Sequence, residues 1–426
     1  MSRANLRSHV FVACWLGLSA GGFAQPAAAE PVRMLCLDQE GQAVAGAEIH
    51  LFQYDGEAER YKPFGPFRSD AEGKAACDKE LFTNTAGNFD RWLYARLPGM
   101  LVGAARCTKF PGGEPINADG EIRLWPSASV EGKVTVPEGF DPRMVTVRVM
   151  TLHIVTGPDF FDYQSFTREE RFTGLNTALP AIFEHHPDAD GHIQFDDVPV
   201  KGSLYLVTSG AGLAEAQWRN NNKVFDRPIE LPIGRECITT GRALTPDGKP
   251  AVGVTVSAHL TSRSGAMYLS TFKSVTNEKG EYAIHGLPQK NFDLSVVDPK
   301  KRWVFPPMEN LLGHPSTALE LNLNLESGVL VTGRVSDADG KPIANAALSA
   351  LSDTQNAAGL DNAVTDAEGR YKLRLPSGKA KLYFNSLPTG FAYPNPQIVK
   401  TLDITAGQRD MEKLDFTLER KGDSEK

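Results

Sequence analysis

The densest group of potentially reactive side chains lies in the segment FEHHPDADGHIQFDD. It contains the imidazoles of His185, His186 and His192 and the carboxylates of Asp188 and Asp190. Imidazole and carboxylate groups together suit several divalent metals, so one interpretation is a metal site. A calcium loop is disfavoured, because the twelve-residue ligand spacing of such loops is absent.

The same segment has a simpler interpretation as a turn. An Asp or Asn residue followed closely by glycine recurs along the chain, and Asp188 with Gly191 is one instance. Asp side chains accept hydrogen bonds from the backbone of such turns. We therefore expect Asp188 and Asp190 to form a turn rather than a metal site, and we expect no cofactor. The three histidines are peculiar to this copy.

A second group of candidate residues is aromatic. The segment GPDFFDYQSFTREERF carries Phe160, Phe161, Tyr163 and Phe166 beside Asp and Gln residues. Exposed rings of this kind could stack on sugars or hold a peptide, and these four are our candidate ligand-binding residues. Aromatic rings also bury large areas at interfaces. We favour this alternative, in which the rings fill the gap between neighbouring domains.

Both groups lie in one copy of an internal repeat. The clearest copies are GRVSDADGKPIANAAL with TDAEGRYKL and GRALTPDGKPAVGVTV with TNEKGEYAI. Glycine marks a first turn in each copy at Gly41, Gly139, Gly248 and Gly340, and a second turn at Gly73, Gly191, Gly280 and Gly369. The two turns are 52 residues apart in the second copy and 29 to 32 apart in the others. The second copy therefore has an insertion, at about 152–187.

The pattern around the turns is that of β-strands. Val331, Gly333 and Val335 alternate with polar residues, which is the period of a half-buried strand. Short strands and dense turns predict an all-β protein of four tandem antiparallel Greek-key β-sandwich domains, transthyretin-like or immunoglobulin-like. The linkers are short, which predicts a semi-rigid rod. The expected divisions are a signal peptide (1–29), sandwich repeats at 30–127, 128–233, 234–326 and 327–420, and a charged tail (421–426).

The turn and strand motifs resemble those of the carboxypeptidase regulatory-like domain. The pairing of GxVxDxxGxPxxxAxV with TDxxGxY, followed by LPSGKAKLYF, carries this resemblance best in the fourth repeat. The family has a transthyretin-like sandwich that is also classed as a carbohydrate-binding-like fold. The resemblance implies this fold for nearly the whole mature chain, but its motifs specify strands and turns rather than chemistry.

The N-terminus predicts export. Arg3 and Arg7 precede an apolar stretch from Val10 to about Ala24, and the small residues Ala27 to Ala29 follow it, which is typical of a cleaved secretory signal. We expect a secreted or periplasmic protein with no membrane span in the mature chain. The formal net charge of −7 argues against a nucleic-acid partner.

Four cysteines remain after the expected cleavage, and an even count in an exported protein suggests disulfides. Repeat alignment places Cys36 and Cys77 facing inward, so we expect them to pair. The alternative is that they are buried free thiols that act as small apolar residues.

No motif predicts catalysis. HExxH, GxSxG and phosphate-loop patterns are absent from the expected mature chain, residues 30–426. The chain ends in ERKGDSEK rather than the Tyr-Arg-Gly-Ser tail of the small transthyretin-like hydrolases. We expect a non-catalytic binding or spacer protein whose partner at the cell envelope is a protein or a polysaccharide. The alternatives are carbohydrate binding through the aromatic insertion and service as an accessory subunit of a separately encoded peptidase or hydrolase.

Overall fold

The computed structural model describes residues 32–55, 60–77, 91–106, 121–154, 171–173, 179–200, 202–219, 228–260, 271–353 and 359–421. The expected signal peptide lies outside these ranges, as do Phe160, Phe161, Tyr163 and Phe166. We keep the names repeat 1 (30–127), repeat 2 (128–233), repeat 3 (234–326) and repeat 4 (327–420) for the four copies.

Repeat 1 sets the strand order that the other copies follow. Its smaller sheet has the order β4-β1-β7, and its larger sheet has the order β3-β2-β5-β6. The strands are β1 (Val32–Leu37), β2 (Glu48–Asp55), β3 (Arg60–Arg68), β4 (Lys74–Cys77), β5 (Arg91–Leu97), β6 (Leu101–Arg106) and β7 (Glu121–Arg123). The first and last strands pair in parallel, and the other pairs are antiparallel.

Repeat 2 has the same order with additions between its third and fourth strands. Its smaller sheet is formed by β8 (Trp125–Thr135), β12 (His192–Pro199) and β15 (Ile229–Pro232). Its larger sheet is formed by β10 (Arg171–Thr173), β9 (Thr146–Ile154), β13 (Gly202–Gly210) and β14 (Leu213–Arg219). The additions are α1 (Pro180–Phe183) and β11 (Glu184–His185), which lie at the end of the insertion.

Repeats 3 and 4 repeat this order again. In repeat 3 the strands are β16 (Cys237–Leu244), β17 (Thr255–Leu260), β18 (Thr271–Val275), β19 (Glu281–Leu287), β20 (Asn291–Val297), β21 (Met308–Leu312), β22 (Leu319–Glu320) and β23 (Leu323–Asn324). In repeat 4 they are β24 (Val329–Asp337), β25 (Ala347–Ser352), β26 (Gly359–Val364), β27 (Arg370–Leu375), β28 (Gly378–Ser386), β29 (Ile398–Ile404) and β30 (Phe416–Leu418).

The turn glycines are required for two different reasons, as repeat 4 illustrates. Gly340 and Gly369 both have a positive φ, of 78° and 74°, which favours glycine. A Cβ atom on Gly369 would also lie 2.4 Å from the backbone oxygen of Val335, whereas one on Gly340 would meet nothing within 4 Å. The second turn therefore needs glycine for close packing as well as for its backbone conformation.

The hydrophobic core is divided into clusters that follow the repeats, with one exception. In repeat 4 the alternating residues Val331, Val335, Leu373 and Leu382 are buried between the two sheets, as their spacing predicts. The expectation of an all-β protein built from antiparallel sandwiches is confirmed. The exception is the core of repeat 2, which includes Phe52 and other residues from repeat 1.

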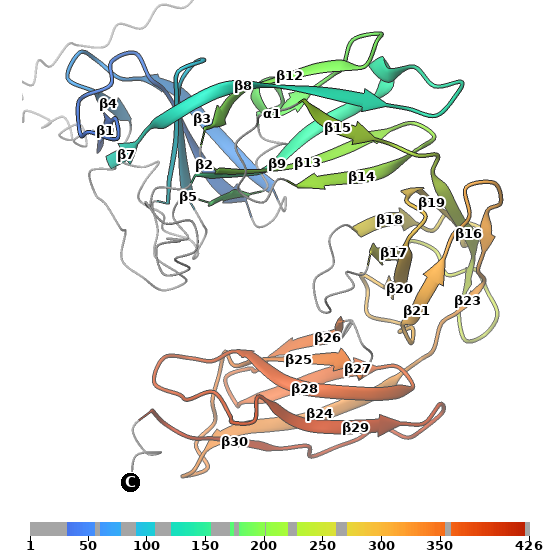
Figure 1. Ribbon diagram of the computed structural model, residues 1–426. Helices are drawn as coiled ribbons and strands as arrows, with labels where there is room; N and C mark the ends of the chain where they lie inside the picture. Colours follow the sequence, from blue (N-terminus) through green and yellow to red (C-terminus); the bar gives the residue numbers. More distant parts are fainter. Residues whose placement is uncertain are drawn as a thin grey trace, which may run out of the picture.

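The repeats do not follow a straight line. Figure 1 shows the chain turning at repeat 3, so that repeat 4 lies under repeats 1 and 2 in this view rather than in line with them. The expected rod is therefore not the arrangement of the structure. Short linkers limit the distance between neighbours but not the angle between them, and repeats 3 and 4 also touch through side-chain contacts. One such contact is the ion pair between Lys301 and Asp361, at 2.8 Å between Nζ and Oδ1.

Candidate functional site at the junction of repeats 1 and 2

The larger sheet of repeat 1 has buried side chains on both faces along β2 and β5. Along β2, Ile49 and Leu51 point into the core of repeat 1. Successive strand residues point to opposite faces, so His50 and Phe52 point the other way. Phe52 is nonetheless fully buried, because residues of repeat 2 cover this outer face.

The covering residues come from the end of the repeat 2 insertion. The ring of Phe183 in α1 lies edge-on against Tyr94 of β5, with 5.2 Å between the ring centroids. Both side chains are almost fully buried. Phe183, at the end of the insertion, thus fills a gap between neighbouring repeats. For Phe160, Phe161, Tyr163 and Phe166 that interpretation stays a prediction.

The two repeats also share one sheet. Strand β8 pairs with β6 of repeat 1 through Trp125 and Pro126, and with β15 of its own repeat through residues 132–135. A single sheet therefore runs from β3 through β8 to β12. Figure 1 shows β8 as the long strand that joins the two halves of this unit.

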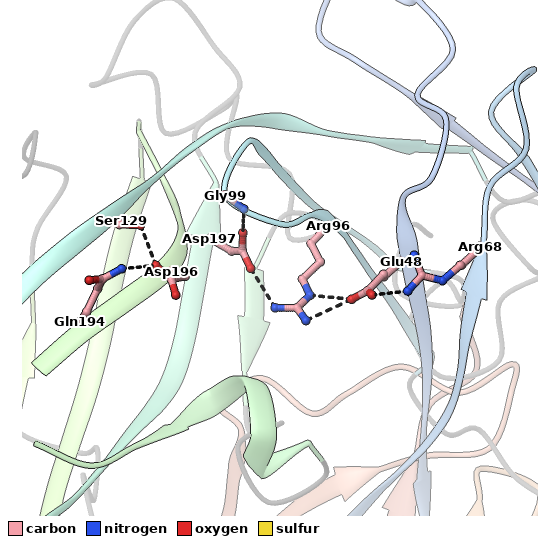
Figure 2. Close-up of polar contacts among 8 residues, drawn as sticks. All are labelled: Glu48, Arg68, Arg96, Gly99, Ser129, Gln194, Asp196 and Asp197. Carbon is pink, nitrogen blue, oxygen red and sulfur yellow. Dashed lines mark hydrogen bonds and ion pairs between the residues drawn. The ribbon is translucent and has the colours of Figure 1, made fainter.

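A chain of charged side chains crosses the junction (Figure 2). Arg96 of β5 binds Glu48 of β2 at 3.0 Å on one side and Asp197 of β12 at 2.9 Å on the other. Glu48 also binds Arg68 at 2.8 Å. The second oxygen of Asp197 accepts a hydrogen bond of 2.7 Å from the backbone N–H of Gly99. The Asp197 carboxylate, which is almost fully buried, is therefore held by two donors from repeat 1.

An irregularity in β12 aims Asp197 at repeat 1. The register of β12 with β8 shifts between Phe195 and Val198, which is the mark of a β-bulge. Asp197 has a φ of 57°, a conformation that Asp tolerates better than most residues. The neighbouring Asp196 remains exposed and accepts hydrogen bonds from Ser129 and Gln194 (Figure 2).

Sequence reasoning did not single out Glu48 and Arg96. Each is charged and has apolar residues on both sides or next to it in its strand, and this is the signal that the sequence offers. A charge on the face of a sheet that a neighbouring repeat covers must find a partner. The sequence alone could not show that this face is covered.

The predicted metal-ligating residues are only partly brought together. Ligand atoms of Asp188, Asp190 and His192 lie within 4.8 Å of one another, and all three residues are exposed. Asp188 Oδ1 already accepts hydrogen bonds from the N–H groups of Asp190 and His192, at 2.9 and 2.8 Å. In repeat 4, Asp366 binds the corresponding N–H groups in the same way, at 3.0 and 2.7 Å. Asp188 thus caps a turn that the repeats share.

The other two histidines of that segment face elsewhere. The ring of His185 lies edge-on against Phe195, with 5.0 Å between centroids, and burial lowers the pKa of His185. The Nδ1 atom of His186 lies 3.2 Å from the backbone oxygen of Val145. Neither residue belongs to the group formed by the turn.

The expected pair Cys36 and Cys77 is not a disulfide in the structure. Cys36 is a free and fully buried cysteine, and burial raises its pKa to about 12. Strand pairing places Cys77 opposite Val32, four positions from Cys36 along β1. The alternative of a buried thiol acting as an apolar residue thus describes Cys36. Cys237 in repeat 3 is likewise free and buried.

The fold defines a tandem β-sandwich protein, and sequence comparison identifies its last part. Residues 330–419 match the sequence profile of the carboxypeptidase regulatory-like domain family. This match confirms the resemblance in repeat 4. No curated protein matches the chain in sequence. None of the described helices has the length and hydropathy needed to cross a lipid bilayer.

Several solved structures align with the chain at low similarity. A streptococcal ancillary pilin is 12% identical with a TM-score of 0.22, and the alignment covers 69% of this chain and 99% of the pilin. The Bacillus anthracis TIE protein is 13% identical with a TM-score of 0.19, covering 89% of this chain and 69% of that protein. The major pilin subunit of Bacillus cereus is 10% identical with a TM-score of 0.18, covering 69% and 99% respectively. Scores this low do not establish a common overall structure.

Proposed function

We propose that this chain is an exported, non-catalytic binding or spacer protein in which repeats 1 and 2 act as one rigid unit. The observation that supports this proposal is the single sheet that runs through β8 into both repeats. Buried packing by Phe183 and the ion pair between Arg96 and Asp197 reinforce the union. A rigid unit of this kind can hold a binding segment in a fixed position for a partner, which favours a binding role over catalysis.

The segment that it would present is the aromatic insertion. Strands β9 and β10 flank residues 155–170 and pair with each other, with Arg171 opposite His153. On the other side, α1 fixes the end of the insertion against repeat 1. Function tends to concentrate in loops that a rigid scaffold positions. The second candidate function is therefore carbohydrate binding through Phe160, Phe161, Tyr163 and Phe166.

Retention on immobilised polysaccharides tests the binding proposal. The full chain should be retained on at least one polysaccharide of a panel, and Phe161→Ala and Tyr163→Ala should each abolish retention. Tyr393→Ala is the matched control, because Tyr393 is an exposed aromatic side chain in repeat 4. Unchanged retention of the two insertion variants would contradict sugar binding through these rings and would leave the spacer role.

Export is part of the same proposal. The N-terminal pattern predicts cleavage after Ala29. Expression of the full sequence in a bacterial host should deliver a mature protein to the periplasm or medium, with Glu30 as its first residue. Retention of the intact N-terminus in the cytoplasm would contradict export.

A further inference from the structure

His50 is a buried histidine at the junction of repeats 1 and 2. Its side chain lies on the outer face of β2, and its ring centroid is 6.5 Å from that of Phe52 and 6.4 Å from that of Tyr94. The residue is 5% exposed. Within the described part of the chain its Nε2 atom has no hydrogen-bond partner. Protonation of this imidazole is unfavourable, because the buried charge would lose its solvation and have no hydrogen-bond acceptor at Nε2.

The charged groups around His50 are already paired with one another. Arg96 of β5 lies diagonally across from His50, because Glu48 pairs with Arg96 and His50 pairs with Tyr94 in the strand register. Arg96 forms ion pairs with both nearby carboxylates, Glu48 on β2 and Asp197 on β12. Arg68 of β3 binds the other side of Glu48. A proton on His50 would therefore add a buried cation beside Arg96 with no carboxylate left unpaired.

The direction of the pKa of His50 agrees with this geometry. Burial lowers the pKa of His50, Arg96 lowers it further, and Glu48 offsets only part of the effect. When the junction is open, His50 has its ordinary pKa of about 6.5. Below that pH, the His50 imidazole binds a proton more readily in the open form than in the closed form. The free energy that holds the junction closed therefore falls as the pH falls.

We propose that His50 makes the union of repeats 1 and 2 sensitive to acid. The junction stays closed while the imidazole is neutral, and acidification loosens the contact of β2 and β5 with repeat 2. Repeat 4 keeps its packing over the same range, because it lies outside this contact and contains no histidine. The inference concerns the junction itself and holds whatever the insertion binds.

Hydrogen exchange on the full chain tests the proposal. Protection factors, corrected for intrinsic exchange, are compared at pH 7.5 and pH 5.5 for peptides that cover 91–102 and 192–199. At pH 5.5, one pH unit below the ordinary pKa, we expect wild-type protection to fall by up to about tenfold. Peptides that cover 371–384 in repeat 4 should be unaffected. The variant His50→Phe, which keeps an apolar ring between Phe52 and Tyr94, should remove the loss.

Two further measurements keep the test decisive. His185→Phe is the matched control, because His185 is a second histidine near the repeat 2 core whose pKa burial lowers. It should keep the acid-induced loss. If His50→Phe does not fold, NMR titration of the His50 imidazole in the wild-type chain should show less protonation at pH 6.5, while the junction is closed, than the half expected of an ordinary imidazole. Equal loss in wild type and His50→Phe, or an ordinary His50 titration in the closed junction, would overturn the proposal.

Discussion

Arg96 and Asp197 are 101 residues apart in the chain and bind each other at 2.9 Å across the junction of repeats 1 and 2. The side chain of Asp197 is 3% exposed, and that of Arg96 is 23% exposed. A buried ion pair is weak evidence for stability in itself, because both charges lose solvation. The pair does require a close match between the two repeats, because Asp197 binds both Arg96 and the N–H of Gly99.

Removing Asp197 should destabilise the junction. In Asp197→Ala the guanidinium of Arg96 and the N–H of Gly99 lose a buried acceptor, and alanine must adopt a positive φ. Breaking a fully buried pair costs about 3–5 kcal/mol. We expect about 2 kcal/mol, because Arg96 is partly exposed. Urea unfolding of the full chain, followed by tryptophan fluorescence, measures the change, and junction peptides should lose protection in hydrogen exchange.

The neighbouring Asp196 provides the control for that variant. Asp196 is exposed, and among the described residues it accepts hydrogen bonds from Ser129 and Gln194, both within repeat 2. We expect Asp196→Ala to cost less than about 0.5 kcal/mol, as is usual for a surface change. If the two alanine variants had equal effects, the contact with Arg96 would contribute nothing to the junction.

The two turns of repeat 4 should respond differently to the same substitution. Gly340→Ala introduces only the cost of a positive φ, about 1–2 kcal/mol, because no atom lies within 4 Å of the new Cβ. Gly369→Ala adds a collision with the oxygen of Val335 at 2.4 Å. We expect Gly369→Ala to cost at least about 1 kcal/mol more than Gly340→Ala, measured by hydrogen exchange of β24 and β27. Equal costs would show that the backbone relaxes around the second turn.

A buried tyrosine should contribute to the closure of each of the last two sandwiches. The hydroxyl of Tyr371 donates to the backbone oxygen of Leu414 at 2.6 Å, and Tyr282 donates to Leu321 at 2.8 Å in the same position of repeat 3. We expect Tyr371→Phe to cost about 1 kcal/mol, the net value of one hydrogen bond. Tyr393→Phe, which changes an exposed ring, should cost nothing measurable in the same exchange experiment. If Tyr371→Phe left the free energy of unfolding unchanged, water would have to replace the tyrosine as the hydrogen-bond donor to the backbone oxygen of Leu414.

The parts of the fold that could be predicted from sequence are the local ones. Gly340 and Gly369 are each specified within a few residues of chain, and so is the alternation of Val331 and Val335. The junction is different, because Glu48, Arg96 and Asp197 are brought together only by the packing of two repeats. Strand alternation implies that His50 and Phe52 share a face, but it does not imply that repeat 2 covers that face.

The predicted rod of repeats is wrong for a related reason. Short linkers predict a rod, yet repeats 3 and 4 also contact each other through their side chains. Lys301 reaches Asp361, and Glu326 accepts hydrogen bonds from the backbone and hydroxyl of Ser377 at 2.8 and 2.6 Å. Contacts of this kind have no signature in composition or period.

The turn that holds Asp188, Asp190 and His192 gives a sharp test of turn against metal. A turn predicts unequal effects, because only Asp188 accepts hydrogen bonds from the backbone of the turn. Asp188→Ala should cost about 1 kcal/mol, while Asp190→Ala and His192→Ala should leave the unfolding of repeat 2 unchanged. A metal site predicts instead that added zinc or calcium raises the melting temperature of the wild type. In that case all three variants would lose the increase equally, and chelation would reverse it.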